Sequence, residues 1–149
     1  MKLEQEIKQE KFTSEYHKLN VNIIFTGSWL TMKNSENMKP FKITIQQYNI
    51  LRILRGQHPE PATVNLLIER MLDKMSNASR IVDKLLAKKL AERRSCSNDR
   101  RCVDVIITDK GLKLLSKIDV LIEKWECEFK NISLKEAKEL NRLLDKLRG

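Results

Sequence analysis

The chain has 149 residues, of which 41% are hydrophobic, 33% are charged and 5% are aromatic. That length suits one ordinary domain, and with only four glycines and three prolines the composition excludes collagen-like and low-complexity chains and favours helix. No apolar run of about 18 residues exists, so no membrane span is predicted. Residues 1–6 lack the apolar core of a signal peptide, which predicts a cytoplasmic protein.

Basic residues exceed acidic ones, with 29 Lys and Arg against 20 Asp and Glu, a formal charge of +9. The excess is concentrated between Asp73 and Arg101, where nine basic and four acidic residues leave a surplus of five. Such a block predicts a polyanionic partner, because a merely solvated helix face usually alternates the signs of its charges.

The N-terminal segment, residues 3–31, has the apolar periodicity of one long helix. Its two apolar stripes consist of Phe12, Tyr16, Leu19, Ile23 and Leu30, and of Val21, Phe25 and Trp29. Two stripes exceed what the flank of a small domain buries, so we expect this helix to enter a dimer interface. Residues 33–42 are predicted to form a polar connector.

The next helix begins with a capping box formed by Thr44 and Gln47, and it is predicted to stop before Gly56. Residues 59–61, Pro-Glu-Pro, then form a turn.

Two short helices joined by a tight turn follow. Thr63 is expected to cap a helix over residues 64–71, and Ser76 to cap a second helix that ends near residue 88 or 89. The second helix is basic and starts with small polar residues, which is a helix-turn-helix pattern.

After Leu90 the period changes to that of strands. Residues 90–94 and 102–107 are predicted to form a hairpin, with turn residues at 97–100. Thr108 caps a further helix, and a capping box at Ser133 opens the last one. The apolar stripe of the first of these helices is Leu112, Leu115, Ile118, Ile122, Trp125 and Phe129.

Helix-turn-helix followed by a basic hairpin is a winged helix, and this arrangement points to double-stranded DNA. An α-helix fits the major groove with its N-terminal residues at the base edges, and arginine enters narrow minor grooves. Arg80 can bond bidentately to guanine, whereas Lys84 and the strand arginines suit phosphates. The predicted DNA contacts are Ser76, Asn77, Ser79, Arg80 and Lys84 on the helix, and Arg93, Arg94, Asn98, Arg100 and Arg101 on the hairpin.

Three segments of this sequence resemble the MarR family (multiple antibiotic resistance regulators). They are residues 72–85, which resemble its recognition helix, residues 99–103, which resemble its wing motif, and residues 106–111, which resemble the start of its dimerisation helix. The resemblance implies a homodimer on a pseudo-palindromic operator, with Arg101 in the minor groove and Asp99 as a structural ion-pair residue of the wing. Where the family commonly has Gly after the recognition helix, this chain has Lys89, and a left-handed lysine there costs about 1 kcal/mol.

Members of the family often bind small aromatic compounds in a crevice between the dimer helices and the winged-helix core. The resemblance therefore implies a small aromatic effector, for which Tyr16, His17, Trp29 and Tyr48 are the candidate contacts, although large aromatics usually belong to the core. No cofactor is expected. The family's oxidant-sensing cysteine near the first helix has no counterpart, because no cysteine precedes Cys96.

Three other functions can be compared with that of a ligand-responsive DNA-binding regulator. Cys96 and Cys102 flank the wing tip, so a regulatory disulfide would make the protein redox-responsive, whereas Cys127 suits a buried apolar position. A winged-helix protein-interaction module would need an acidic or apolar recognition face. An enzyme is disfavoured, because His17 and His58 have no metal-ligand partner and no catalytic motif is present.

We therefore expect a single domain that is mainly α-helical. Residues 44–107 form its winged-helix DNA-binding core, and residues 1–32 and 108–149 supply dimerisation helices. The function this predicts is a ligand-responsive repressor.

Overall fold

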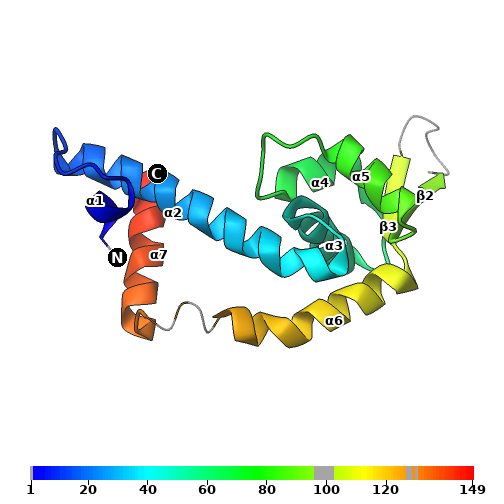
Figure 1. Cartoon of the computed structure of the whole chain (residues 1–149). Helices are drawn as coiled ribbons and strands as arrows, with labels where there is room; N and C mark the ends of the chain where they lie inside the picture. The colour runs from blue at the N-terminus through cyan, green and yellow to red at the C-terminus, as the bar shows by residue number, and fades with distance from the viewer. Residues whose placement is uncertain (1, 96–102, 127–128, 130) are drawn as a thin grey trace.

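The middle of the chain folds into three helices with a small sheet at their edge. The computed structural model describes residues 2–95, 103–126, 129 and 131–149 (Figure 1). The helices are α3 (Ile45–Gln57), α4 (Val64–Arg70) and α5 (Ala78–Ala87), and the strands are β1 (Ala62–Thr63), β2 (Ala91–Ser95) and β3 (Val103–Ile107). The strand order is β1-β3-β2, and both pairings are antiparallel. The winged-helix fold predicted from the sequence is confirmed.

The core of this winged helix lies around α3. Ile50, Leu51 and Leu54 of α3 are buried against residues that come from every neighbouring element. Those residues include Leu67 of α4, Val82 and Leu85 of α5, Val105 and Ile107 of β3, and Leu115 and Ile118 of the following helix. Burial of one such aliphatic side chain contributes about 1.5–3 kcal/mol, so the packing of α3 fixes the position of α5.

The start of α3 follows the predicted capping box. Thr44 Oγ1 accepts from the backbone N–H of Gln47 at 3.2 Å, and Gln47 Oε1 accepts from the N–H of Thr44, also at 3.2 Å. The helix then continues through Gly56 to Gln57, so the prediction that it stops before Gly56 is wrong. Proline disfavours helical backbone in the residue that precedes it, so Pro59, and not the glycine, sets the end.

The short helix α4 is capped as predicted, with Thr63 Oγ1 accepting from the N–H of Leu66 at 3.1 Å. The predicted hairpin is also confirmed, although β2 begins one residue later than expected and extends to Ser95. Strand β1 was not expected. It is only two residues long, and its existence depends on pairing with β3, which no local pattern reveals.

The N-terminal helix differs from its prediction at both ends. A short helix α1 (Leu3–Glu6) comes first, and the long helix α2 (Glu15–Met38) begins where Ser14 Oγ accepts from the N–H of His17 at 3.1 Å. The predicted polar connector at 33–42 is largely helical, because residues 33–39 contain no glycine or proline that would interrupt the helix. A single 3-10 turn, η1 (Lys39–Phe41), then leads into α3.

Two helices complete the chain, α6 (Asp109–Glu126) and α7 (Leu134–Arg148). Thr108 and Ser133 cap them as predicted, each hydroxyl accepting from a backbone N–H three residues later. Phe129 was expected to extend the apolar stripe of α6. The helix ends at Glu126, and Phe129 lies beyond it with 48% of its surface exposed.

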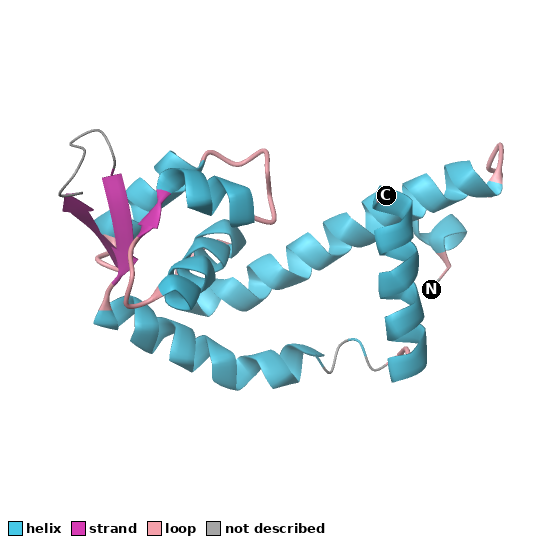
Figure 2. Cartoon of the chain, turned by 180° about the vertical axis from the view of Figure 1, so that it is seen from behind, coloured by secondary structure: helices cyan, strands magenta, loops and turns pink. Residues whose placement is uncertain are grey.

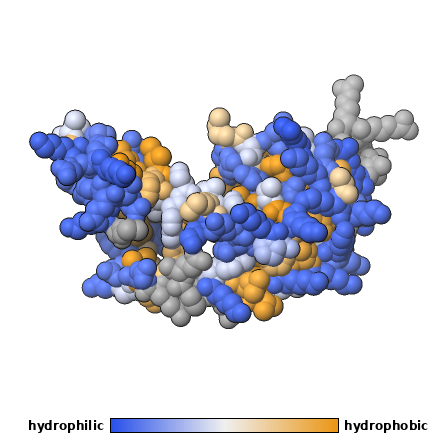
Figure 3. Space-filling view, viewed as in Figure 1, coloured by the Kyte–Doolittle hydropathy of each residue, from blue (hydrophilic) through white to orange (hydrophobic). Residues whose placement is uncertain are grey.

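Helices α2, α6 and α7 extend away from the winged helix, and α7 stands apart from it (Figures 1 and 2). Of the 15 residues of α7 none is buried, and apolar side chains of α2 and α7 reach the molecular surface, as the orange patches of Figure 3 illustrate for one face. The exposed apolar side chains are Tyr16, Leu19, Ile24, Trp29 and Met32 on α2 and Leu134, Leu140, Leu143 and Leu147 on α7. None of the described helices is long and apolar enough to cross a lipid bilayer.

Candidate nucleic-acid interface

The turn between α4 and α5 is held by one aspartate. The Ser76 hydroxyl donates to Asp73 Oδ2 at 2.6 Å, and the backbone N–H of Met75 donates to Oδ1 at 3.1 Å. These hydrogen bonds favour the ionised carboxylate and lower the pKa of Asp73 below its ordinary value. The turn therefore keeps them at neutral pH and loses them only as the pH falls through that lowered pKa.

The helix cap lies one residue later than predicted. Asn77, and not Ser76, is the N-cap of α5, and its side-chain Oδ1 accepts from the N–H of Arg80 at 3.0 Å. Ser76 precedes this cap, and its hydroxyl is directed to Asp73 in the turn. The amide oxygen of Asn77 is thus engaged in the cap, and its side chain sits at the very start of the helix.

Helix α5 has one buried and one exposed face. Its buried face consists of Ala78, Val82 and Leu85, with Ile81 and Leu86 half-buried beside them. The predicted contacts Ser79, Arg80 and Lys84 are all exposed and lie within two turns of the helix start. The structure therefore brings together the short polar and the long basic side chains that were expected on the recognition helix.

Helix α5 ends in a Schellman motif. The N–H of Lys89 donates to the carbonyl of Leu86 at 2.8 Å, and the N–H of Leu90 donates to the carbonyl of Leu85 at 3.0 Å. Lys89 has a φ of 57°, so the helix ends in the left-handed conformation despite its cost for a lysine. The lysine adopts the geometry for which glycine is preferred.

The two arginines of β2 are exposed but already have acidic neighbours. Arg93 Nη2 lies 2.7 Å from Asp83 Oδ1 on α5, and Arg94 Nε lies 3.5 Å from Glu92 Oε1. More than half of each of these side chains is exposed, so the pairs are weak and screened by salt. The Arg93 pair joins the strand to the recognition helix and lowers the net positive charge of that surface.

Several predicted residues lie outside the described part of the chain. They are the wing contacts Asn98, Arg100 and Arg101, the wing aspartate Asp99, and the cysteines Cys96, Cys102 and Cys127. Their predicted roles stay predictions.

The candidate effector contacts do not gather at one place in a single chain. Tyr16 and His17 lie in the first turn of α2, about 20 Å along the helix from Trp29, and Tyr16 is 85% exposed. His17 stacks edge-on against Phe12, with ring centroids 5.6 Å apart. Tyr48 is buried in the core, with the guanidinium of Arg52 over its ring. Of the four candidates it is the one whose burial supports a role in core packing.

A cluster of lysines at the far end of α5 was not predicted. Lys88 Nζ donates to the Gln47 side-chain oxygen at 3.1 Å and to the carbonyl of Lys42, and Lys110 Nζ donates to the carbonyl of Lys88 at 2.8 Å. These residues come from three elements, so only the tertiary fold unites them. No group of three or more potential metal ligands occurs among the residues that the structure describes.

The geometry above has counterparts among known proteins. The sequence model of the MarR family matches residues 41–101, which include α3, α4, α5, β1 and β2. A MarR transcription factor from Planctomyces limnophilus superposes with a TM-score of 0.69 at 29% identity, over 91% of this chain and 98% of that one. Residues 41–101 of this chain therefore match the MarR family.

Two further structures show that the chain shares their fold over nearly its whole length. A putative MarR-like transcription regulator from Bacillus cereus gives a TM-score of 0.80 at 21% identity, over 90% of this chain and 96% of that one. A mutant MarR from E. coli complexed with operator DNA gives a TM-score of 0.79 at 23% identity, over 93% of this chain and 99% of that one. The likeness thus includes α2, α6 and α7 besides the winged helix.

Proposed function

We propose that this protein is a sequence-specific DNA-binding transcription regulator. The observation that carries the proposal is the first two turns of α5, where Ser79, Arg80 and Lys84 are exposed after a turn that Asp73 holds in place. A rigid turn positions the helix start without an entropic cost on binding, and an exposed arginine there suits a guanine edge. The MarR structure solved with operator DNA supports the same use of the fold.

We further propose that it acts as a homodimer on a pseudo-palindromic operator. The exposed leucines of α7 and the apolar side chains of α2 are what a second copy would cover. Two-fold symmetry would then place the two α5 helices about 34–36 Å apart, one turn of B-DNA. The sign of regulation we propose is repression, relieved when a small aromatic effector favours a dimer with a different spacing between these helices.

The decisive experiment is binding to selected DNA. An operator is first enriched from a random duplex library with the full-length protein, and its affinity is then measured by fluorescence anisotropy against a scrambled duplex at physiological salt. We expect binding at least about a thousandfold tighter to the operator. Weak binding to both duplexes that disappears with added salt would leave only a basic surface and would overturn the proposal.

Single variants separate base reading from phosphate binding. Arg80→Ala should cost about 1–3 kcal/mol on the operator and relax the preference at one base position, whereas Lys84→Ala should weaken both duplexes equally and flatten the salt dependence. Lys124→Ala, an exposed lysine near the end of α6, is the matched control. An equal loss on both duplexes for Arg80→Ala would assign this residue to a phosphate.

A further inference from the structure

The winged helix exposes large apolar side chains in one region only, as far as residues 45–95 and 103–107 are concerned. They are Ile68 of α4 and, in the turn that follows, Leu72 and Met75. Met75 is 95% exposed, so almost nothing in the chain packs against its side chain. Apolar side chains that gather at the surface beside a binding region mark a contact with a partner.

The turn that carries Met75 is held by hydrogen bonds from three side chains. Asn49 Oδ1 on α3 accepts from the backbone N–H of Leu72 at 3.1 Å, and Asp73 Oδ1 accepts from the N–H of Met75 itself at 3.1 Å. The ammonium group of Lys74 donates to two carbonyls near the end of α4. The backbone at Met75 is therefore fixed, although its side chain is free to contact a partner.

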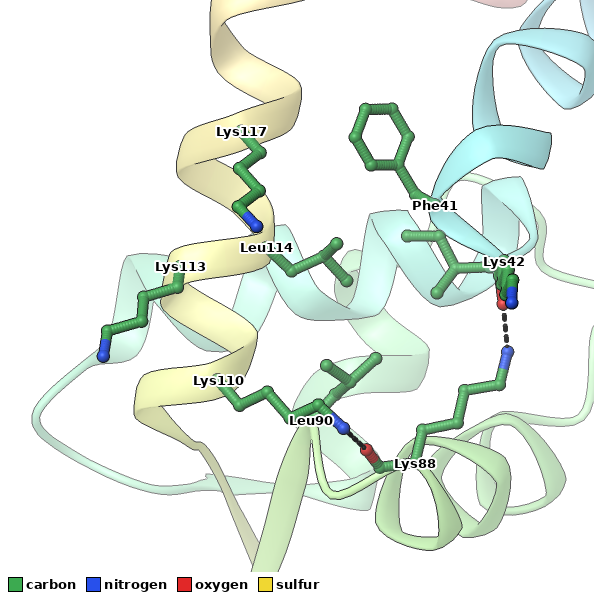
Figure 4. Close-up of a pocket in the computed structure, with 9 residues that line it drawn as sticks. Phe41, Lys42, Lys88, Leu90, Lys110, Lys113, Leu114 and Lys117 are labelled. Carbon is green, nitrogen blue, oxygen red and sulfur yellow. Dashed lines mark hydrogen bonds between the residues drawn. The ribbon is translucent and has the colours of Figure 1, made fainter.

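The far end of the recognition helix is fixed as well. In Figure 4, the ammonium group of Lys88 donates to the carbonyl of Lys42, and that of Lys110 donates to the carbonyl of Lys88. These bonds tie the end of α5 to the segment before α3 and to α6. A helix that is held at both ends enters a groove in one defined position, so the residue just before it meets one defined base pair.

Met75 lies at the end of α5 that carries the proposed base contacts, two residues before the N-cap Asn77. The exposed neighbours Ser79 and Arg80 form hydrogen bonds, and the amide oxygen of Asn77 is already engaged in the cap. Met75 thus adds an apolar side chain to a polar surface. The apolar feature that base pairs present in the major groove is the C5-methyl group of thymine, and an unbranched thioether adapts well to such a contact.

We propose that Met75 is a specificity-determining residue that contacts the C5-methyl group of one thymine in the operator half-site. This inference rests on the proposed function, because it requires α5 in the major groove. A protein partner is disfavoured, since the fixed turn continues directly into the proposed DNA surface. Leu72 lies on the α4 side of the turn, five residues before the N-cap, and takes no part in base recognition.

The test is a scan of the selected operator in which each thymine is replaced singly by deoxyuridine, which lacks only the C5-methyl group. In anisotropy titrations the parent should lose about fourfold in affinity at one thymine of the half-site, the effect expected for one buried methyl group. Met75→Ala should bind the unmodified operator at least about fourfold more weakly and should not respond to deoxyuridine at that thymine.

Two further variants complete the scan. Met75→Leu keeps an apolar side chain and should keep the response to deoxyuridine. Leu72→Ala is the matched control, because it truncates another exposed apolar side chain of the same turn, and it should behave like the parent on every duplex. Urea unfolding checks that the variants fold, since truncating an exposed side chain leaves the core intact.

Other outcomes would overturn the inference. If Met75→Ala kept the parent's loss at every thymine, another residue would contact the methyl group. If Leu72→Ala lost the response as well, the turn would act as an unspecific apolar surface. A parent that prefers its operator but responds to deoxyuridine nowhere would overturn this inference alone, whereas equal binding to operator and scrambled duplex would overturn the proposed function with it.

Discussion

Lys89 closes the recognition helix in a backbone conformation that ordinarily favours glycine. With a φ of 57° at Lys89, the backbone N–H groups of Lys89 and Leu90 donate to carbonyls in the last turn of α5. In this conformation, however, the Cβ of an L-residue lies too close to the backbone. We expect Lys89→Gly to stabilise the protein by about 0.5–1 kcal/mol, measured as a higher urea midpoint with unchanged slope. Lys89→Ala keeps the Cβ and is the control. If Ala gave the same gain as Gly, the benefit would come from removing the lysine charge.

At position 111 glycine is required because there is no room for a side chain, and not because of its backbone conformation. A Cβ at this position of α6 would collide with the backbone carbonyl of Leu90 and would lie 2.7 Å from Cγ1 of Ile107. Gly111→Ala should therefore destabilise the protein by about 1–3 kcal/mol in the same urea experiment. Gly27→Ala provides the contrast. That glycine has open space around it in the middle of α2, so alanine there should stabilise by about 0.5–1 kcal/mol.

At the scale of elements, the wing strand and the recognition helix are joined by the ion pair of Arg93 and Asp83. Both side chains are more than half exposed, so breaking the pair should change stability by less than about 1 kcal/mol. Its effect on DNA should be larger, because Asp83→Asn removes a negative charge from the recognition surface and releases Arg93 for phosphates. We expect tighter binding to operator and scrambled duplex alike and a steeper salt dependence in anisotropy titrations. A loss of affinity would show instead that Asp83 positions Arg93.

The helix starts were predictable because the information lies within four residues. Thr44, Thr63 and Ser133 each accept from a backbone N–H three residues later, as the local pattern indicates. At Ser76 the same pattern failed. The Ser76 hydroxyl donates to Asp73 in the turn, and the side chain of Asn77 accepts the N–H of Arg80 as the helix cap. A sequence pattern finds the cap region but does not decide between adjacent candidates.

Features that depend on distant pairing were not predictable in this way. Strand β1 exists through its pairing with β3, in which Thr63 lies opposite Asp104 and Ala62 opposite Val105, more than 40 residues further along the chain. The lysine cluster at the far end of α5 likewise joins Lys88 to the carbonyl of Lys42 and to Lys110, which are far apart in the sequence. Recognition-helix residues were predictable because they are close together in the sequence, whereas this cluster was not because its residues are far apart.

At the scale of the whole molecule, the exposed leucines of α7 predict association. Leu140 and Leu147 lie on one face of the helix, two turns apart, and are 49% and 57% exposed. We expect the parent to sediment as a dimer at micromolar concentration and Leu140→Glu/Leu147→Glu to sediment as a monomer, because each carboxylate would be buried without a partner. Leu72→Glu, which changes a more exposed leucine (86%) in the turn of the winged helix, should stay dimeric. A monomeric parent would contradict the proposed assembly.

The junction at Thr108 couples the position of the recognition helix to that of α6. Its backbone N–H donates to the carbonyl of Leu90, its hydroxyl donates to the carbonyl of Lys89, and Lys110 holds the carbonyl of Lys88. These bonds join the end of the recognition helix to the start of α6, an arm of 18 residues or about 27 Å. Tilting such an arm by about 10° about this joint displaces its far end by about 5 Å. Because Leu115 and Ile118 of α6 also pack into the core around α3, the winged helix and the first half of α6 move as one body, so a small rotation of the recognition helix becomes a large displacement of the distal end of α6.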